Sequence, residues 1–152
     1  MQKILVSACL LGANVRYNAV PKPYHHAKLS QWRNQGRLIT VCPEVAGGLA
    51  TPRPAAEYQP SKQLIMNTQG QDVTDAFLSG AKHALALCKK HNISFALLKE
   101  FSPSCGRQKI YDGSFTNNKV EGQGLTAKIL IENGIRVYSE LMMEELIAVV
   151  EE

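Results

Sequence analysis

The chain has 152 residues, of which 45% are hydrophobic and 20% are charged, and its formal net charge is +4. This length is typical of one domain with its own core, so we expect a single domain over residues 1–152. No apolar run approaches the roughly 20 residues that span a bilayer, and the first residues lack the apolar core of a signal peptide. The composition therefore argues against a membrane protein and predicts a cytoplasmic one, in which thiols stay reduced.

The positive charge is compatible with an anionic or nucleotide-like ligand, but its distribution does not predict nucleic-acid binding. Lysines and arginines are scattered, and no basic run is interleaved with aromatic residues, as a dedicated DNA or RNA surface requires. We expect a small-molecule partner instead, and a chain that acts as a monomer or a homodimer.

Apolar runs and helix signals alternate along the chain. They predict strands at 3–8, 38–41, 63–67, 93–98 and 135–138, and helices at 27–35, 125–132 and 140–150. A longer helix is predicted to start at an N-cap within 72–75 and to run to about residue 90. Strands that alternate with helices are joined by right-handed crossovers, so we expect an α/β protein with a three-layer, Rossmann-like fold and a mostly parallel sheet. The intervening segments 43–60 and 99–124 are predicted as irregular. Long loops inside a compact domain are usually functional.

Three of the four cysteines follow a short apolar run, and these are Cys9, Cys42 and Cys105. If the runs are parallel strands, the three thiols meet at one edge of the sheet, where open α/β folds place their chemistry. Cys88 instead belongs to the apolar stripe of the long predicted helix, and we expect it to pack in the core.

Three converging thiols indicate a metal or iron–sulfur centre with one position left open. Structural zinc usually takes four ligands and shows a close Cys-x-x-Cys pair, which this sequence lacks. Iron–sulfur clusters also normally use four cysteines, so three ligands mean either an incomplete site or an iron that is free for a substrate. Spacing alone leaves open that these are unrelated buried thiols.

Several segments resemble one family in their order and spacing. The match covers nearly the whole chain and includes Ser7-Ala8-Cys9-Leu10-Leu11-Gly12 and Gly122-Gln123-Gly124-Leu125-Thr126-Ala127. Its most specific parts are Cys42-Pro43-Glu44-Val45 and Ser102-Pro103-Ser104-Cys105-Gly106. In these segments the sequence is similar to the thiouracil desulfurase family.

The resemblance implies an oxygen-sensitive [4Fe-4S] cluster held by Cys9, Cys42 and Cys105. It also implies an enzyme that removes sulfur from a thiolated pyrimidine such as 2-thiouracil, giving uracil and sulfide. A glutamate and a serine near the cluster handle protons and the attacking water, and they map onto Glu44 and Ser102, with Ser104 as the competing serine. On the residues alone, the acid is also compatible with a backbone-capping role and the two serines with turn-stabilising hydroxyls.

Two other functions stay open at this point. A cluster-free sulfur carrier would hold a persulfide on Cys105 or Cys9, and a non-catalytic module would bind a metal or a nucleotide without turning it over. The pattern Gly122-x-Gly124-x-x-Ala127 formally resembles a dinucleotide fingerprint, but a fingerprint must follow a strand and the preceding residues form a poor one.

Two loop features bear on the expected site. Arg53 lies between two prolines and has either a plain surface role or one in which it reaches an anionic or carbonyl group. The family typically has Arg-Tyr-Asp-Gly where this chain has Arg16-Tyr17-Asn18-Ala19. A changed loop at the mouth of a site alters which ligand fits more readily than which chemistry takes place.

Overall fold

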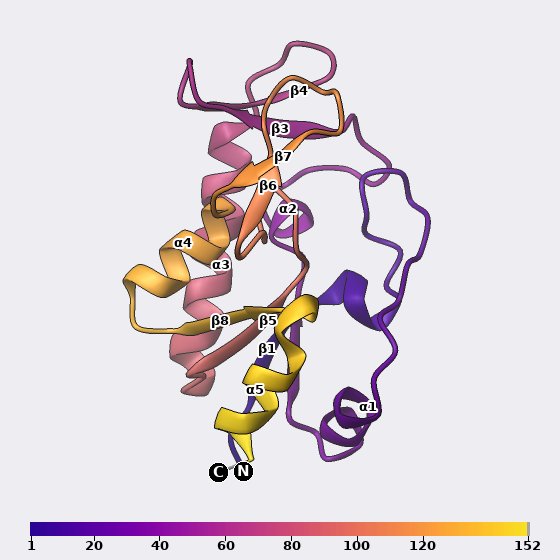
Figure 1. Cartoon of the computed structure of the whole chain (residues 1–152), viewed down its shortest axis with the longest axis vertical. Helices are drawn as coiled ribbons and strands as arrows, with labels where there is room; N and C mark the ends of the chain where they lie inside the picture. Colours follow the sequence, from indigo (N-terminus) through magenta and orange to yellow (C-terminus); the bar gives the residue numbers. More distant parts are fainter. Residues whose placement is uncertain (152) are drawn as a thin grey trace.

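A four-stranded parallel sheet forms the centre of the computed structural model, which describes residues 1–151. Its strands are β1 (Ile4–Ser7), β2 (Leu38–Val41), β5 (Phe95–Leu98) and β8 (Arg136–Ser139), in the spatial order β2-β1-β5-β8. Every neighbouring pair in this sheet is parallel, and the registers keep the strands in step (Figure 1). The carboxyl ends of β1, β2 and β5 therefore meet at one edge.

Helices cover both faces of this sheet (Figure 1). One face is covered by α1 (Ala27–Asn34) and α5 (Met143–Val150), and the other by α3 (Thr74–His91) and α4 (Leu125–Glu132). The predicted α/β fold with three layers and a mostly parallel sheet is confirmed.

The central strands alternate their side chains between the two helical layers. Val6 packs in the same cluster as Trp32 of α1, whereas Leu5 packs in the cluster that contains Leu130 of α4. All residues of β1 and β5 are buried, which is typical of parallel strands covered on both faces. Cys88 is 1% exposed and belongs to the second cluster, so its predicted core position is confirmed.

The segment 43–60, predicted as a loop, contains regular structure. It begins with the short helix α2 (Pro43–Ala46) and later forms β3 (Ala56–Gln59). β3 pairs antiparallel with β4 (Leu64–Asn67), so β4 lies in a hairpin outside the main sheet. β3 mixes polar and apolar residues and lacks the apolar run of the other four-residue strands, and α2 is a single helical turn, too short to show a helical period.

The segment 99–124, also predicted as irregular, holds a second antiparallel hairpin of β6 (Lys109–Tyr111) and β7 (Lys119–Glu121). All three residues of β7 are exposed, so the strand lacks the alternation that marks a half-buried strand.

Two element ends also differ from the prediction. Residues Ala8–Leu11 form a 3₁₀ turn (η1) after β1, and a second 3₁₀ turn, η2 (Glu140–Met142), precedes α5.

Helices α2 and α3 touch backbone to backbone through two glycines. A Cβ atom on Gly80 would lie 1.8 Å from the Pro43 carbonyl oxygen, and one on Gly47 would lie 2.0 Å from the Ala76 carbonyl oxygen. Only residues without a side chain permit this approach. The contact fixes α2, and with it Cys42 at the start of that helix.

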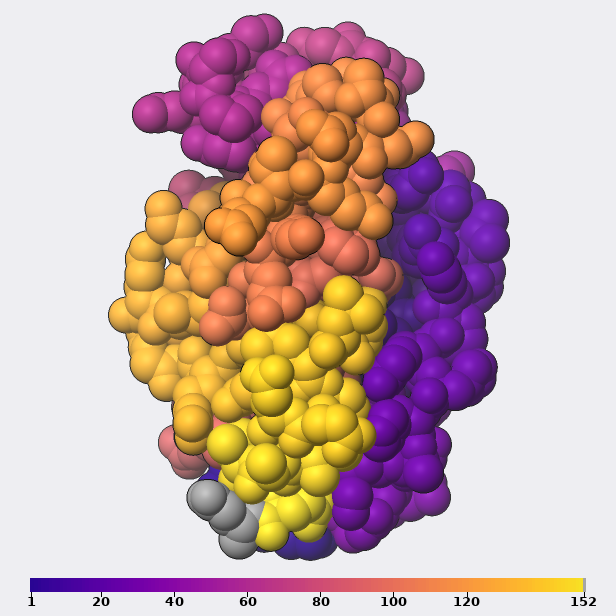
Figure 2. All heavy atoms as spheres, in the orientation of Figure 1, coloured from indigo at the N-terminus to yellow at the C-terminus, as the bar shows by residue number. Residues whose placement is uncertain are grey.

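The two hairpins lie together at one end of the molecule, away from both chain termini (Figure 1). In the space-filling view, the orange residues around β6–β7 lie against the magenta residues around β3–β4 (Figure 2). The Gln59 side chain joins them by donating a hydrogen bond to the Gly113 carbonyl oxygen at 3.1 Å. Within the described residues, the helices are too short or too polar for a transmembrane span.

Candidate functional site

A cavity of about 390 Å³ lies between the carboxyl edge of the sheet and the two hairpins. Its lining comes from the residues after β1, β2 and β5, from the loop that follows η1, and from both hairpins. Cavities at this edge are the usual ligand sites of open α/β sheets.

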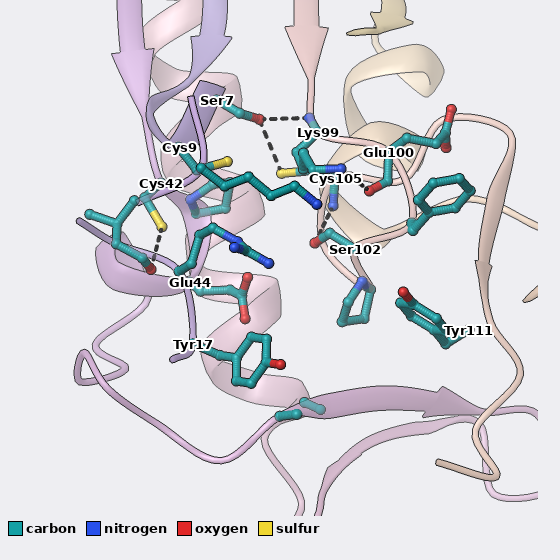
Figure 3. A pocket seen from close by; sticks show the side chains of 18 of the residues that line it. Ser7, Cys9, Tyr17, Cys42, Glu44, Lys99, Glu100, Ser102, Cys105 and Tyr111 are labelled. Carbon is teal, nitrogen blue, oxygen red and sulfur yellow. Dashed lines mark hydrogen bonds between the residues drawn. The ribbon is translucent and has the colours of Figure 1, made fainter. Parts of the chain in front are cut away.

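Cys9, Cys42 and Cys105 all line this cavity and reach it from three elements (Figure 3). Cys9 lies in η1, Cys42 directly precedes α2, and Cys105 lies in the tight loop after β5. The parallel registers explain the convergence, because each thiol follows a strand that ends at the same edge. Cys88 lies in the core and does not line the cavity.

Burial holds these three thiols in their protonated form. Burial, with a smaller contribution from the nearby Cys42, raises the pKa of Cys9 to about 11. The pKa values of Cys42 and Cys105 are also raised, in both cases mainly by burial. A cationic group in the cavity would offset this penalty, because metal ligation favours thiolates. The donor set therefore suits a metal-containing group.

The set of donor atoms indicates which group the cavity could bind. Three thiols from three separate elements line it, and the fourth cysteine, Cys88, does not. An iron–sulfur cluster has several iron atoms, each bound by one thiolate, so three cysteines can hold three of them. Structural zinc usually takes four ligands and shows a close Cys-x-x-Cys pair, which this chain lacks. The donor atoms therefore fit an iron–sulfur cluster.

Glu44 lies in the first turn of α2 and lines the cavity. Its Oε1 atom is 3.4 Å from Nε of Arg53, and both side chains are largely buried. Burial raises the pKa of the Glu44 carboxyl, and the Arg53 guanidinium opposes this rise. The structure thus places the predicted acid beside the thiols and holds its carboxylate in one orientation.

Arg53 ties together two loops of the site. Its Nη2 atom donates to the Val15 carbonyl oxygen at 2.9 Å, and its Nη1 atom donates to the Ala50 carbonyl oxygen at 3.1 Å. Its backbone N–H donates to the Tyr17 carbonyl oxygen at 2.7 Å. Of the two roles left open for this residue, the structure supports the one in which it reaches carbonyl and anionic groups.

The two candidate serines occupy different environments. Ser102 lines the cavity, and its Oγ accepts hydrogen bonds from the N–H groups of Ser104 at 3.0 Å and Cys105 at 3.1 Å. Its own hydroxyl proton stays available for the cavity. Ser104 is fully buried, and its Oγ pairs with the Thr126 hydroxyl at 2.8 Å. This placement favours Ser102 as the serine that faces a ligand.

The glycine pattern near α4 supports the cysteine loop. A Cβ atom on Gly124 would lie 2.4 Å from the backbone carbon of Ser104, so only glycine allows this contact. The N–H of Thr126, in the first turn of α4, donates to the Ser104 carbonyl oxygen at 2.8 Å. The pattern follows the exposed hairpin strand β7 and not a strand of the parallel sheet, which differs from a dinucleotide fingerprint.

Glu100 holds the other end of the same loop. Its Oε1 accepts hydrogen bonds from three consecutive backbone N–H groups, at 2.7, 2.9 and 3.2 Å, of Arg107, Gln108 and Lys109. These bonds oppose the effect of burial and lower the pKa of this carboxyl. Cys105 is therefore fixed by contacts on both sides of its loop.

Sequence reasoning missed an aromatic and cationic wall of the cavity. Phe101 and Tyr111 line it, with ring centroids 6.4 Å apart. The ammonium groups of Lys119 and Lys99 lie 3.9 and 5.5 Å from the Phe101 ring centroid. Phe101 has φ of +71°, which is uncommon for a residue with a side chain. The pairing of β6 with β7, invisible in the sequence, creates this wall.

Glu57 is a second missed residue. It is 8% exposed, lines the cavity, and its Oε1 accepts hydrogen bonds from the N–H groups of Gly113 at 2.9 Å and Phe115 at 3.3 Å. It therefore ties β3 to the loop between β6 and β7. The signal available in the sequence was an acidic residue in a segment with few apolar residues. Its hydrogen-bond partners depend on how the two hairpins pack against each other.

The segment Arg16-Tyr17-Asn18-Ala19, which differs from the family pattern, forms a local turn. Asn18 Oδ1 accepts a hydrogen bond from the Val20 N–H at 3.0 Å, as an aspartate could. Ala19 has φ of +57°, a backbone conformation that suits glycine better. The chain thus keeps a turn at this point with a residue that strains it.

The fold and the site together define a class of protein: a three-layer α/β protein with three cysteines at one cavity. The model of the 2-thiouracil desulfurase family matches residues 4–141, and the chain belongs to this family. The resemblance predicted from the sequence is confirmed.

Two similar proteins extend over the same length. "Uncharacterized protein YbbK" of Bacillus subtilis (strain 168) is 37% identical over 155 residues, which cover 95% of this chain and 99% of that protein. A solved structure, described as the [4Fe-4S]-dependent thiouracil desulfidase TudS, is 46% identical with a TM-score of 0.96 and covers 99% of both chains.

Proposed function

We propose that this protein is a [4Fe-4S]-dependent desulfurase that converts a thiolated pyrimidine such as 2-thiouracil into uracil and sulfide. The observation that carries the proposal is the meeting of Cys9, Cys42 and Cys105 at one cavity. The family match and the 46% identity to a [4Fe-4S]-dependent thiouracil desulfidase support it.

The three cysteines would hold the cluster and leave one iron without a protein ligand. When bound, such an iron supplies Lewis-acid chemistry, since it takes a soft thione sulfur and withdraws electron density from the carbon that carries it. Cys105 is buried, and Cys9 and Cys42 are partly buried, which limits the access of water to their side of the cavity.

Glu44 is proposed to orient the attacking water and to accept its proton. Its carboxylate lines the cavity beside Cys42. Arg53 binds Oε1 at 3.4 Å and so limits the directions that the carboxylate can take. A fixed carboxylate within reach of the water is the geometric requirement for a general base.

Ser102 is proposed to donate a hydrogen bond to the pyrimidine or to deliver a proton to it. Its oxygen already accepts two backbone N–H groups, so its proton is directed away from the loop. Ser104, the competing serine, is proposed to support the loop through Thr126 and to take no direct part.

The similarity to a solved [4Fe-4S]-dependent thiouracil desulfidase, at 46% identity over 99% of both chains, favours this function over a persulfide carrier or a zinc-binding module. We further propose a cytoplasmic location, since four cysteines without disulfides suit a reducing compartment.

Purification without oxygen tests the proposal. We expect a brown protein with iron and sulfide near the amounts for one cluster per chain, which releases sulfide from 2-thiouracil and leaves uracil. Cys105→Ser should abolish the release, whereas Cys88→Ala, in the core, should keep it if the chain still folds. A colourless wild-type protein that releases sulfide would overturn the cluster-dependent function.

A further inference from the structure

Ser7 lies at the end of β1 and is 2% exposed. Its Oγ accepts a hydrogen bond from the Lys99 N–H at 3.0 Å and donates one to Sγ of Cys105 at 3.5 Å (Figure 3). Neither contact is needed to explain the positions of the three cysteines, which follow from the strand registers.

The direction of the hydroxyl proton is fixed by these two partners. The backbone N–H of Lys99 can only donate, so the serine oxygen must accept there and its proton is left for the sulfur. β1 and β5 are adjacent and paired up to Val6 and Leu97, so the sheet backbone holds donor and acceptor in place. The bond is thus built into the rigid part of the fold.

The three thiols differ in their hydrogen-bond partners. Cys42 lies near backbone groups, with the Val15 carbonyl oxygen at 4.0 Å from its sulfur. The Ser104 hydroxyl also contributes a hydrogen bond that lowers the pKa of Cys105, but it is shared with the Thr126 hydroxyl at 2.8 Å, where either group can be the donor. The Ser7 proton is instead committed to the Cys105 sulfur, because the serine oxygen accepts the Lys99 N–H.

We propose that Ser7 is a positioning residue that sets the reduction potential of the cluster through its hydrogen bond to the Cys105 sulfur. The inference rests on the proposed function. A donor to a thiolate sulfur withdraws electron density and stabilises the reduced form of a cluster, which carries more negative charge. The effect is strong in a buried, low-dielectric site.

Removal of the donor should make the reduction potential more negative. The test loads the wild type, Ser7→Ala and Ser7→Thr with the cluster in the absence of oxygen and measures midpoint potentials by redox titration. We expect Ser7→Ala to shift to a more negative value, and Ser7→Thr, which keeps the hydroxyl, to stay near the wild type. Ser7→Ala with a bound cluster at the wild-type potential would overturn the inference.

Thr74→Ala is the matched control. Thr74 lies at the start of α3 and outside the lining of the cavity, and its Oγ1 accepts the Ile65 N–H at 2.9 Å. Its loss should leave the potential unchanged. An equal shift in this variant would mean that any lost hydroxyl perturbs the cluster, and would also overturn the inference.

A second measurement covers the case in which Ser7→Ala does not retain the cluster. In the wild type, transfer from H₂O to D₂O should shift the iron–cysteine stretching bands, and Ser7→Thr should show the same shift. Bands that do not move in the wild type would overturn the inference. A wild-type protein that binds no cluster overturns the proposed function itself, so the two failures are distinguishable.

Discussion

The floor and the walls of the cavity are built differently. The floor consists of Cys9, Cys42, Glu44 and Cys105, which follow β1, β2 and β5. The walls are the two hairpins, β3–β4 and β6–β7, and the loop at residues 13–24. Of the strands beneath the floor, β1 and β5 are fully buried and β2 is partly buried, whereas β7 in the walls is exposed along its whole length. Groups for chemistry thus rest on rigid elements, and groups that select a ligand rest on elements that sequence changes can reshape.

The backbone shows the same contrast. The loop between β6 and β7 contains three residues with left-handed backbone, Gly113, Phe115 and Asn117. Such turns are held by specific hydrogen bonds, here in part from the Glu57 carboxylate. The registers of the sheet instead fix the floor through regular backbone pairing. Changes in the floor should therefore affect chemistry, and changes in the walls should affect ligand affinity.

Glu44→Gln in the floor has the largest expected effect. The amide keeps the shape and an oxygen for Arg53 but cannot accept a proton, so kcat for sulfide release should fall about 100-fold or more. Steady-state release of sulfide from 2-thiouracil measures it, with iron content as a check that the cluster is retained. Glu121→Gln, on exposed β7, is the control. Activity within twofold of the wild type would remove Glu44 from the mechanism.

Gly80→Ala tests the support beneath the floor. The new methyl would overlap the Pro43 carbonyl oxygen, so α2 must move away from α3. We expect a loss of about 1–3 kcal/mol in the free energy of unfolding, together with weaker cluster retention. Chemical denaturation measures the first and iron content the second. Ser79→Ala, an exposed neighbour on α3, should change neither. An unchanged free energy of unfolding would show that α2 and α3 can move apart without a measurable energetic cost.

Glu57→Ala tests the walls. Loss of the carboxylate leaves the N–H groups of Gly113 and Phe115 without this acceptor, so the loop between β6 and β7, which carries Asn117, should loosen. A charged hydrogen-bond acceptor contributes about 1.5–3 kcal/mol, so we expect KM to rise about 10-fold while kcat changes little. Glu57→Gln keeps an acceptor oxygen and should show a smaller rise. A fall in kcat at constant KM would contradict the division between floor and walls.

Ala19→Gly has the smallest expected effect. Glycine relieves the left-handed strain at this position but makes the unfolded chain more flexible, so we expect a net gain of about 0.5 kcal/mol in stability. Ala13→Gly is the control in the same loop, because Ala13 is not among the residues with positive φ. That change should lower stability by about 0.5–1 kcal/mol. Equal losses in both variants would show that Ala19 is unstrained.

The sequence was sufficient to predict the floor. Apolar runs before Cys9 and Cys42 mark parallel strands of the main sheet, and such strands carry their following residues to a common edge. Cys88 was separated from the other cysteines by the period of its helix alone. The strand and helix positions that build this part of the fold were predicted within a few residues, since their signals are local and strong.

The walls depend on pairing between distant segments, which no local pattern encodes. Glu57 has partners at Gly113 and Phe115, and Arg53 has partners at Val15 and Tyr17. Among the hairpin strands, β4 was predicted, but β3, β6 and β7 have neither the length nor the alternation that predicts a strand. The difference between Ser102 and Ser104 likewise required Thr126, a residue on another helix.

The strand order β2-β1-β5-β8 has a consequence for folding. Cys9, Cys42 and Cys105 are far apart along the chain and meet only when three strands have paired. A group bound to all of them closes two long loops and works as a cross-link, which removes conformations from the unfolded chain. Binding of this group and folding of the chain are then coupled, so removal of the group from the cavity also destabilises the sheet.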